Sequence, residues 1–169
     1  MVAHRLLRLS SILKDKDLRR KRRGFRPMIT DKPNKIITVA RTLINTPYLH
    51  QGREPGVGLD CLGVVELTAI LCGITYSFVA PTNYGRNSSR LLADGLERYC
   101  EEIGIFLPGT IVLCNLSTIP YHCGIITDYQ GRLGLLHAYE NAGRVREHAL
   151  IPWWKDKIYK VYKFPGVEY

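Results

Sequence analysis

The pattern of apolar residues changes between the two halves of this 169-residue chain, and that change limits the fold more than any other feature. In the first half, apolar residues recur at helical spacing in three segments that begin near Asn34, Cys61 and Ser88. In the second half, short β-prone segments alternate with turn residues at 110–113, 122–127, 133–138, 145–148 and 158–164. Helices followed by strands predict an α+β domain with an antiparallel sheet.

A cysteine opens the second of the predicted helices. Asp60 precedes Cys61 and is a residue type that caps helices, whereas Gly73 is a typical helix end. The N–H groups and partial positive charge at a helix start favour thiolate over thiol. We therefore expect Cys61 to be a nucleophile if a histidine faces it, and a small buried residue if none does. The first helix is expected to end near Thr46-Pro47.

Two histidines lie in adjacent predicted strands that are joined around Gln130-Gly131. If these two residues form the loop, His122 lies opposite Tyr139 and His137 is its diagonal neighbour on the same face. A four-residue loop preserves this arrangement, whereas a three-residue loop sends the two histidines to opposite faces. An even loop would allow both rings to serve the same thiol.

The remaining histidines and cysteines have simpler interpretations. Strand alternation directs Cys123 to the face opposite His122, so we expect it to take no part in the same chemistry. Cys72 and Cys100 are interpreted as packed small hydrophobic residues. Zinc binding by His122, His137 and a cysteine matches no common ligand spacing, and neither a metal nor another cofactor is expected. His50 and His148 have no identifiable partners in the sequence.

The positive charge is concentrated at the start of the chain. Residues 1–36 hold 12 of the 24 Lys and Arg residues and 3 of the 15 Asp and Glu residues, so they account for the whole net charge of +9. We interpret 1–33 as a basic, flexible extension and 34–169 as the folded domain. Nucleic-acid binding by the extension is the alternative. Because Met28 follows the basic run, residues 1–27 are hypothesised to lie upstream of the natural start.

Cysteine usage and hydropathy indicate where the protein is made. The five cysteines are odd in number and contain no Cys-x-x-Cys pair, which indicates a reducing compartment rather than a disulfide framework. No apolar run reaches the length of a membrane span. Arg5, Arg8 and Lys14 interrupt the N-terminal apolar segment, so no secretory signal is expected. We predict synthesis in the cytoplasm.

Four short motifs follow one another along the chain: Thr46-Pro47-Tyr48, Asp60-Cys61-x-Gly63, His122-x-Gly124-Ile125 and Leu136-His137-Ala138. Together they resemble the NlpC-type papain-like cysteine peptidases, and specifically the short phage cell-wall peptidases associated with tail assembly. The resemblance covers residues 34–166. It implies a papain-like NlpC-type fold, in which N-terminal helices include a nucleophile helix packed on a C-terminal antiparallel sheet.

The same resemblance implies a role for each motif residue. Cys61 matches the nucleophile, His122 the general base and acid, and His137 the polar residue that orients His122. Tyr48 matches a tyrosine beside the thiol, and Asp60 a residue that helps to hold the amino group of the substrate. The implied reaction is hydrolysis of an amide bond in the peptide stem of peptidoglycan, between D-glutamate and a diamino acid.

One position departs from the family pattern. Many bacterial members carry serine after the cysteine, but Leu62 cannot donate a hydrogen bond to a stem peptide, so we expect altered specificity. The implied partners are the stem peptide and phage tail proteins, and delivery by or assembly into a tail would bring the enzyme to the cell wall without a signal peptide. Two alternatives stay open: a non-enzymatic tail-assembly component of the same fold, and an amidase or acyltransferase of the same superfamily.

Overall fold

The computed structural model of the chain describes residues 31–74, 84–85, 90–116 and 121–169. The chain divides into two units, Met1–Asp31 and Lys32–Tyr169, and the second is described below. The predictions for the basic extension, including those for Met28 and for nucleic-acid binding, fall almost entirely outside the described residues.

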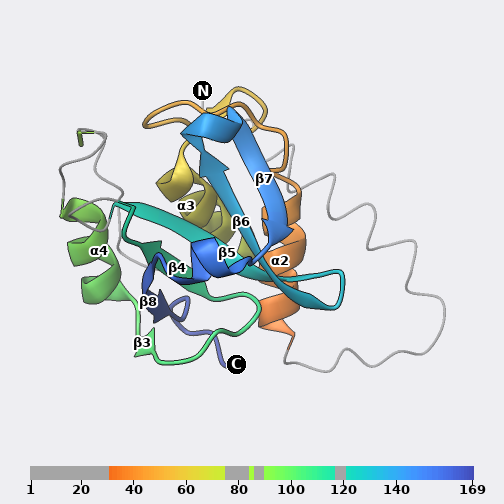
Figure 1. Cartoon of the computed structure of the whole chain (residues 1–169), viewed down its shortest axis with the longest axis vertical. Coiled ribbons are helices and arrows are strands. Elements are labelled where there is room, and N and C mark those ends of the chain that lie inside the picture. Colours follow the sequence, from red (N-terminus) through yellow and green to blue (C-terminus); the bar gives the residue numbers. More distant parts are fainter. Residues whose placement is uncertain (1–30, 75–83, 86–89, 117–120) are drawn as a thin grey trace. The chain divides into compact units, whose positions relative to one another are not determined.

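The described part combines helices with an antiparallel sheet (Figure 1). The helices are α2 (Lys32–Arg41), α3 (Cys61–Cys72), α4 (Leu91–Tyr99) and α5 (Pro152–Lys155), with the 3₁₀ turn η1 (Glu140–Ala142). The main sheet has the order β3-β8-β4-β5-β6-β7, made of β3 (Glu102–Ile103), β8 (Ile158–Tyr162), β4 (Ile111–Cys114), β5 (His122–Tyr129), β6 (Arg132–Tyr139) and β7 (Arg144–Ala149). A small hairpin pairs β1 (Arg53–Glu54) with β2 (Gly58–Leu59).

The predicted α+β class and the five predicted strands are confirmed, with ends shifted by a few residues. The first helix was expected to continue to Thr46 but ends at Arg41. Successive turns with hydrogen bonds to the third preceding residue carry the chain on to Ile44, and Asn45 then adopts a positive φ of 71°. The helical spacing of apolar residues therefore continues beyond the end of the α-helix, because the tighter turns keep the same side of the segment buried.

The β5–β6 hairpin has the two-residue loop that the sequence favours. Tyr129 pairs with Arg132 and Ile125 with Leu136, and Gln130 and Gly131 both have positive φ, as this turn type requires. This register places the two strand histidines on one face of the sheet, as predicted.

Each face of the sheet is covered by a different layer. One face carries α2 and α3, and its core includes Leu113, Cys123 and Leu136. The other face carries α5, whose Trp154 packs with Val112, Ile126 and Leu135 in a second cluster. Figure 1 shows α2 and α3 behind the sheet and the short α5 in front of it.

Helix α3 is the central element of the domain. Its side chains are buried on nearly all sides, from Leu62 to Ala69, because β5 and β6 cover one side and α2 another. It ends at Gly73 in the left-handed conformation, as predicted. In the part of the chain described here, no helix is long and apolar enough to cross a membrane.

Candidate active site

The first turn of α3 is fixed by its cap. Asp60 has an extended backbone, and its side chain accepts a hydrogen bond of 2.8 Å from the N–H of Gly63. A Cβ at Gly63 would lie 2.4 Å from the carbonyl oxygen of Gly52, so only glycine permits this close approach. The glycine of the Asp-Cys-x-Gly motif therefore allows the backbone just before β1 to pack against the start of the helix.

The carboxylate of Asp60 is held by four donors. Besides Gly63, it accepts 2.8 Å hydrogen bonds from the N–H of Gln51 and from Arg53, and a short one from the hydroxyl of Tyr84. These donors use the acceptor capacity of a carboxylate, which is about four sites. A substrate amino group would have to displace one of them to contact Asp60.

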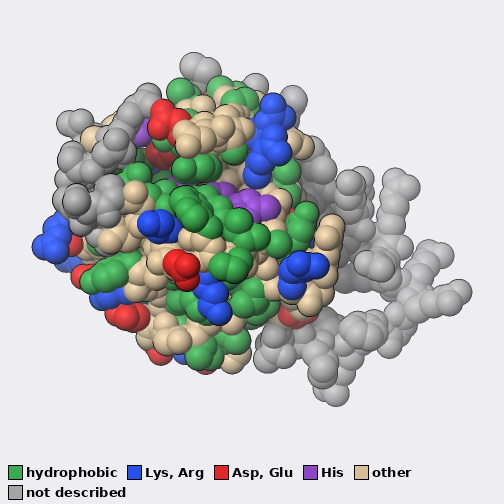
Figure 2. All heavy atoms as spheres, viewed as in Figure 1, with side chains coloured by type: hydrophobic (Ala, Val, Ile, Leu, Met, Phe, Trp, Pro, Cys, Tyr) green, Lys and Arg blue, Asp and Glu red, His purple; other side chains and the backbone are tan. Residues whose placement is uncertain are grey.

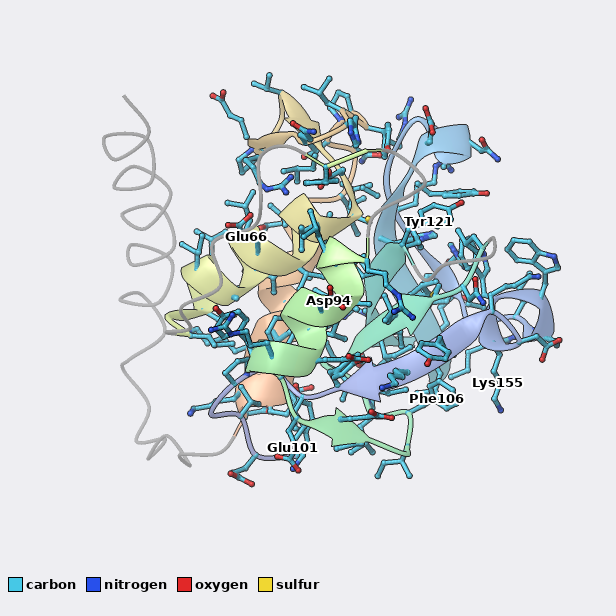
Figure 3. The ribbon with its side chains drawn as sticks, turned by 90° about the vertical axis from the view of Figure 1, so that its left-hand side faces the viewer. Glu66, Asp94, Glu101, Phe106, Tyr121 and Lys155 are labelled. Carbon is cyan, nitrogen blue, oxygen red and sulfur yellow. The ribbon has the colours of Figure 1, made fainter. Side chains whose placement is uncertain are left out.

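Charge and burial fix the protonation states in this network. Burial lowers the pKa of Arg53, but Asp60, Tyr84 and Glu66 raise it by more, so the guanidinium stays charged. Burial, followed by the hydrogen bond to Asp60, raises the pKa of Tyr84 well above its usual value. Arg53 also donates to Glu66 over 2.7 Å, on the side of α3 that faces away from the sheet in Figure 3.

Cys61 is half-buried at the start of α3, and its thiol is perturbed by its neighbours. A hydrogen bond with Cys123 lowers its pKa most, burial opposes this, and the hydrogen bond and charge of His122 lower it further. The net result is a pKa well below that of an ordinary thiol. The sulfur lies 4.0 Å from the carbonyl oxygen of Tyr121, the residue labelled beside the start of β5 in Figure 3.

The two strand histidines are in direct contact. His122 Nε2 lies 2.7 Å from His137 Nδ1. Both residues are buried, with 4 % of the surface of His122 and 1 % of that of His137 exposed. Burial, then the charges of His122 and His148, lower the pKa of His137 well below its usual value, so this ring is neutral at pH 7. His122 faces Cys61 on one side and a neutral imidazole on the other.

A glycine and two aromatic rings fix the position of His137. A Cβ at Gly124 would lie 2.8 Å from Cδ1 of Leu135, 3.0 Å from the carbonyl oxygen of Leu136 and 3.1 Å from Cβ of His137, which explains the His-x-Gly motif. Tyr139 stacks on His137 with the rings 5.6 Å apart and 6° from parallel. Trp154 meets the same ring edge-on at 4.7 Å.

One pocket brings the predicted site residues together. Its lining includes Tyr48, Asp60, Cys61 and His122, whereas His137 lies behind His122. The other members of the wall mix aromatic and polar residues with leucines and small residues: His50, Leu62, Tyr84, Gly85, Leu91, Leu92, Leu116, Tyr121, Ala138, Tyr139, Glu140 and Asn141. Leu62 is only 3 % exposed: it packs in the core and also contributes to the pocket wall.

Three residues have neighbours that could not be identified from the sequence. Cys123 does point away from His122, but α3 covers that face, so its thiol reaches Cys61. His50 has a partner, because its Nε2 lies 2.9 Å from the carbonyl oxygen of Tyr84. His148 also has one, because its Nε2 lies 3.1 Å from Nε2 of His137.

Arg53 and Tyr84 were not singled out from the sequence. Arg53 lies in the two-residue strand β1 and Tyr84 lies outside the helices and strands, so neither gives a periodic signal, and their contact with Asp60 exists only after folding. Among the described residues, no group of three or more His, Cys, Asp or Glu side chains is arranged to hold a metal ion.

Comparison with solved structures finds the same architecture. The NlpC/p60 domain of the peptidoglycan hydrolase SagA superposes with a TM-score of 0.56 at 17 % identity, covering 78 % of this chain and 97 % of that one. This chain has the NlpC/P60 fold. A protein similar to lipoproteins of the NLP/P60 family, from Staphylococcus aureus, gives 0.58 at 17 % identity, and NlpC1 from Trichomonas vaginalis gives 0.59 at 14 %.

The coverage of these proteins differs. The match takes in 86 % and 83 % of this chain but 44 % and 48 % of the last two proteins, so the chain spans less than half of their length. No protein-family model matches the sequence. No curated protein matches it. The comparisons thus bear on the fold, and confirm the predicted papain-like NlpC-type class.

Proposed function

We propose that the protein is a cysteine peptidase that hydrolyses an amide bond in the peptide stem of peptidoglycan. One observation carries the proposal. The thiol of Cys61, whose pKa is lowered by Cys123 and His122, shares a pocket with His122, and His122 is held from behind by the neutral ring of His137. The NlpC/P60 fold, seen in a peptidoglycan hydrolase, supports the same class of substrate.

The chemistry uses each group at a stated atom. The Cys61 thiolate attacks the carbonyl carbon, and the oxyanion forms beside the first turn of α3, where the N–H groups of Cys61 and Leu62 have no preceding helical carbonyl. Protonated His122 gives its proton to the departing amine, which leaves a thioester on Cys61. Water, deprotonated by His122, then attacks the thioester carbonyl and restores the thiolate.

The finer substrate assignment follows the motif resemblance. We propose the bond between D-glutamate and a diamino acid, with Tyr48 beside the thiol in the pocket wall. Direct contact between Asp60 and a substrate amino group requires one of its four donors to leave, and of these four Tyr84 is the residue that lines the pocket. The apolar Leu62 is proposed to narrow the range of stem termini that bind.

The same resemblance extends the proposal to location and partners. We propose action at the cell wall, with delivery by, or assembly into, a phage tail. The alternatives make different predictions: a tail component with a vestigial site would cleave nothing, and an acyltransferase would pass the acyl group to an amine rather than to water.

Incubation with purified muropeptides, followed by mass spectrometry, tests the proposal. The parent protein is expected to release two fragments whose combined mass exceeds that of the substrate by one water, and Cys61→Ala is expected to release none. Cys72→Ala is the matched control, because it makes the same change at the other end of α3. Absence of cleavage by the folded parent protein would favour the vestigial alternative, and an amine adduct would favour acyl transfer.

A further inference from the structure

A third histidine continues the pair behind Cys61. His148 lies on β7 opposite Leu135, which makes it a diagonal neighbour of His137 on the same face of the sheet. Its Nε2 lies 3.1 Å from Nε2 of His137, and its Nδ1 lies 2.9 Å from the carbonyl oxygen of Ala149. The imidazoles of His122, His137 and His148 thus form one hydrogen-bonded chain that ends at a backbone carbonyl.

When His148 is neutral, the carbonyl determines the direction of every hydrogen bond in this chain. A carbonyl oxygen only accepts, so Nδ1 of His148 carries a proton and, in the neutral ring, Nε2 is an acceptor. His137 must then donate from Nε2, which leaves its Nδ1 as an acceptor. His122 in turn donates from Nε2, so its Nδ1 is the nitrogen left unprotonated for the thiol.

The reverse direction would disable the base. If His137 carried its proton on Nδ1, then His122 Nε2 would have to accept, and neutral His122 would carry its proton on Nδ1. That form cannot take a proton from the thiol through Nδ1. Because His137 is buried and neutral, its two tautomers are alternatives, and the partner at Nε2 selects between them.

We propose that His148 is a positioning residue that holds His137, and through it His122, in the tautomer that leaves His122 Nδ1 free to serve as the base for Cys61. This inference rests on the proposed function for its effect on turnover, but not for its effect on the tautomers. The surrounding packing supports it. Trp154 contacts the rings of His122, His137 and His148 at centroid distances of 5.7, 4.7 and 5.9 Å, so one side chain packs against all three.

The three rings of this chain differ in how deeply they are buried. His148 is only half-buried, unlike His122 and His137. Figure 2 shows histidine side chains reaching the surface between hydrophobic ones on the face that carries α5 and β7. Substitution at position 148 therefore changes the outer end of the chain of rings without opening the core.

Three variants of the full-length chain test the proposal. His148→Phe keeps an aromatic ring beside Trp154 but removes the acceptor, whereas His148→Gln retains an acceptor oxygen. Arg146→Gln is the matched control, because Arg146 is exposed on the same strand and the same face. The tautomers of His122 and His137 are read from long-range ¹H–¹⁵N spectra, and the kcat and KM for muropeptide cleavage and the rate of Cys61 alkylation are measured in parallel.

We expect the parent protein to carry the His137 proton on Nε2, and His148→Phe to shift it toward Nδ1. The same variant should lower kcat by about tenfold, with KM nearly unchanged, and slow Cys61 alkylation; His148→Gln should recover most of the loss. Unchanged tautomers in His148→Phe, or an equal loss of kcat in Arg146→Gln, would overturn the proposal. If His148→Phe does not fold, a parent spectrum with the His137 proton on Nδ1 overturns it equally.

The two proposals can fail separately. If the parent protein cleaves no muropeptide while His148→Phe still shifts the His137 tautomer and slows alkylation, the proposed function fails and the role of His148 stands. If the parent cleaves muropeptides and His148→Phe changes nothing, only the role of His148 fails.

Discussion

Two hydrogen-bonded networks meet at Cys61, and they differ in charge. The network before it joins Asp60 to Arg53, Glu66 and Tyr84, and is built on buried and half-buried ions. The network behind it joins His122 to His137 and His148 through imidazoles only. The charged network fixes the backbone around Asp60, because the carboxylate of Asp60 accepts four hydrogen bonds. The imidazole network fixes which ring nitrogen carries each proton, because each ring can both donate and accept a hydrogen bond.

This difference separates their expected effects. Removing a charge from the first network should damage the fold at the start of α3, since the partner ion is left behind. Removing a ring from the second should leave the fold largely intact and alter the protonation of His122. The predictions below, ordered by size, test whether this separation holds.

The largest expected effect is on stability. Asp60→Ala removes the cap of α3 and leaves the half-buried Arg53 without its nearest carboxylate, so the free energy of unfolding should fall by about 3–5 kcal/mol. Asp60→Asn retains the cap, so its free energy of unfolding should lie between that of Asp60→Ala and that of the parent protein. Urea denaturation measures both. Asp94→Ala is the control, because Asp94 is an exposed residue in the first turn of α4. An equal loss of unfolding free energy in Asp94→Ala would show that the Asp60 network contributes no more to stability than an exposed aspartate.

The next effect concerns the thiol where the two networks meet. At pH 7, iodoacetamide should modify Cys61 at least about 100 times faster than the other cysteines, because only its pKa is lowered. Burial raises the pKa of Cys100 and of Cys114 to about 12, and also raises that of Cys72. Peptide mapping by mass spectrometry gives each rate. Comparable rates at Cys61 and Cys72 would contradict the assignment of Cys61 as nucleophile.

Displacing His137 should affect turnover more than stability. The added methyl group of Gly124→Ala meets Leu136 and His137, so we expect kcat to fall by about 100-fold and the free energy of unfolding by about 1–3 kcal/mol. Gly104→Ala is the matched control, because no atom lies within 4 Å of a Cβ at that position. A Gly124→Ala protein with full turnover would show that the spacing of His137 is not critical.

The smallest effect is a dependence of stability on pH. His137 has a folded pKa below the unfolded value of 6.5, so the unfolded state binds the extra proton first as the pH falls below 6.5. Stability is therefore full above 6.5 and should decline below it, by at most about 1.4 kcal/mol per pH unit, until the lowered pKa is reached. His137→Gln should lack this component in urea titrations. Identical slopes in both proteins would indicate that the ring titrates normally.

Local pattern was sufficient for much of the domain. The period of the apolar residues identified α3 and the long strands, and the Gln130-Gly131 turn determined the β5–β6 register. Side chains alternate strictly along a strand, so that register alone brought His122 and His137 to one face. Those inferences depend only on neighbours in sequence or across one hairpin.

Contacts between the sheet and the elements packed on it could be seen only in the structure. Strand parity showed which way Cys123 points but not that α3 covers that face, and so its contact with Cys61 was missed. His148 joins the ring chain through the β6–β7 register, and Arg53 and Tyr84 contact Asp60 from separate segments of the chain. The sequence by itself determined the helix that begins at Cys61 and the histidine hairpin, because local periodicity encodes them. Only tertiary packing decided the partners of Asp60, Cys61 and His137, because those contacts join segments that no local rule relates.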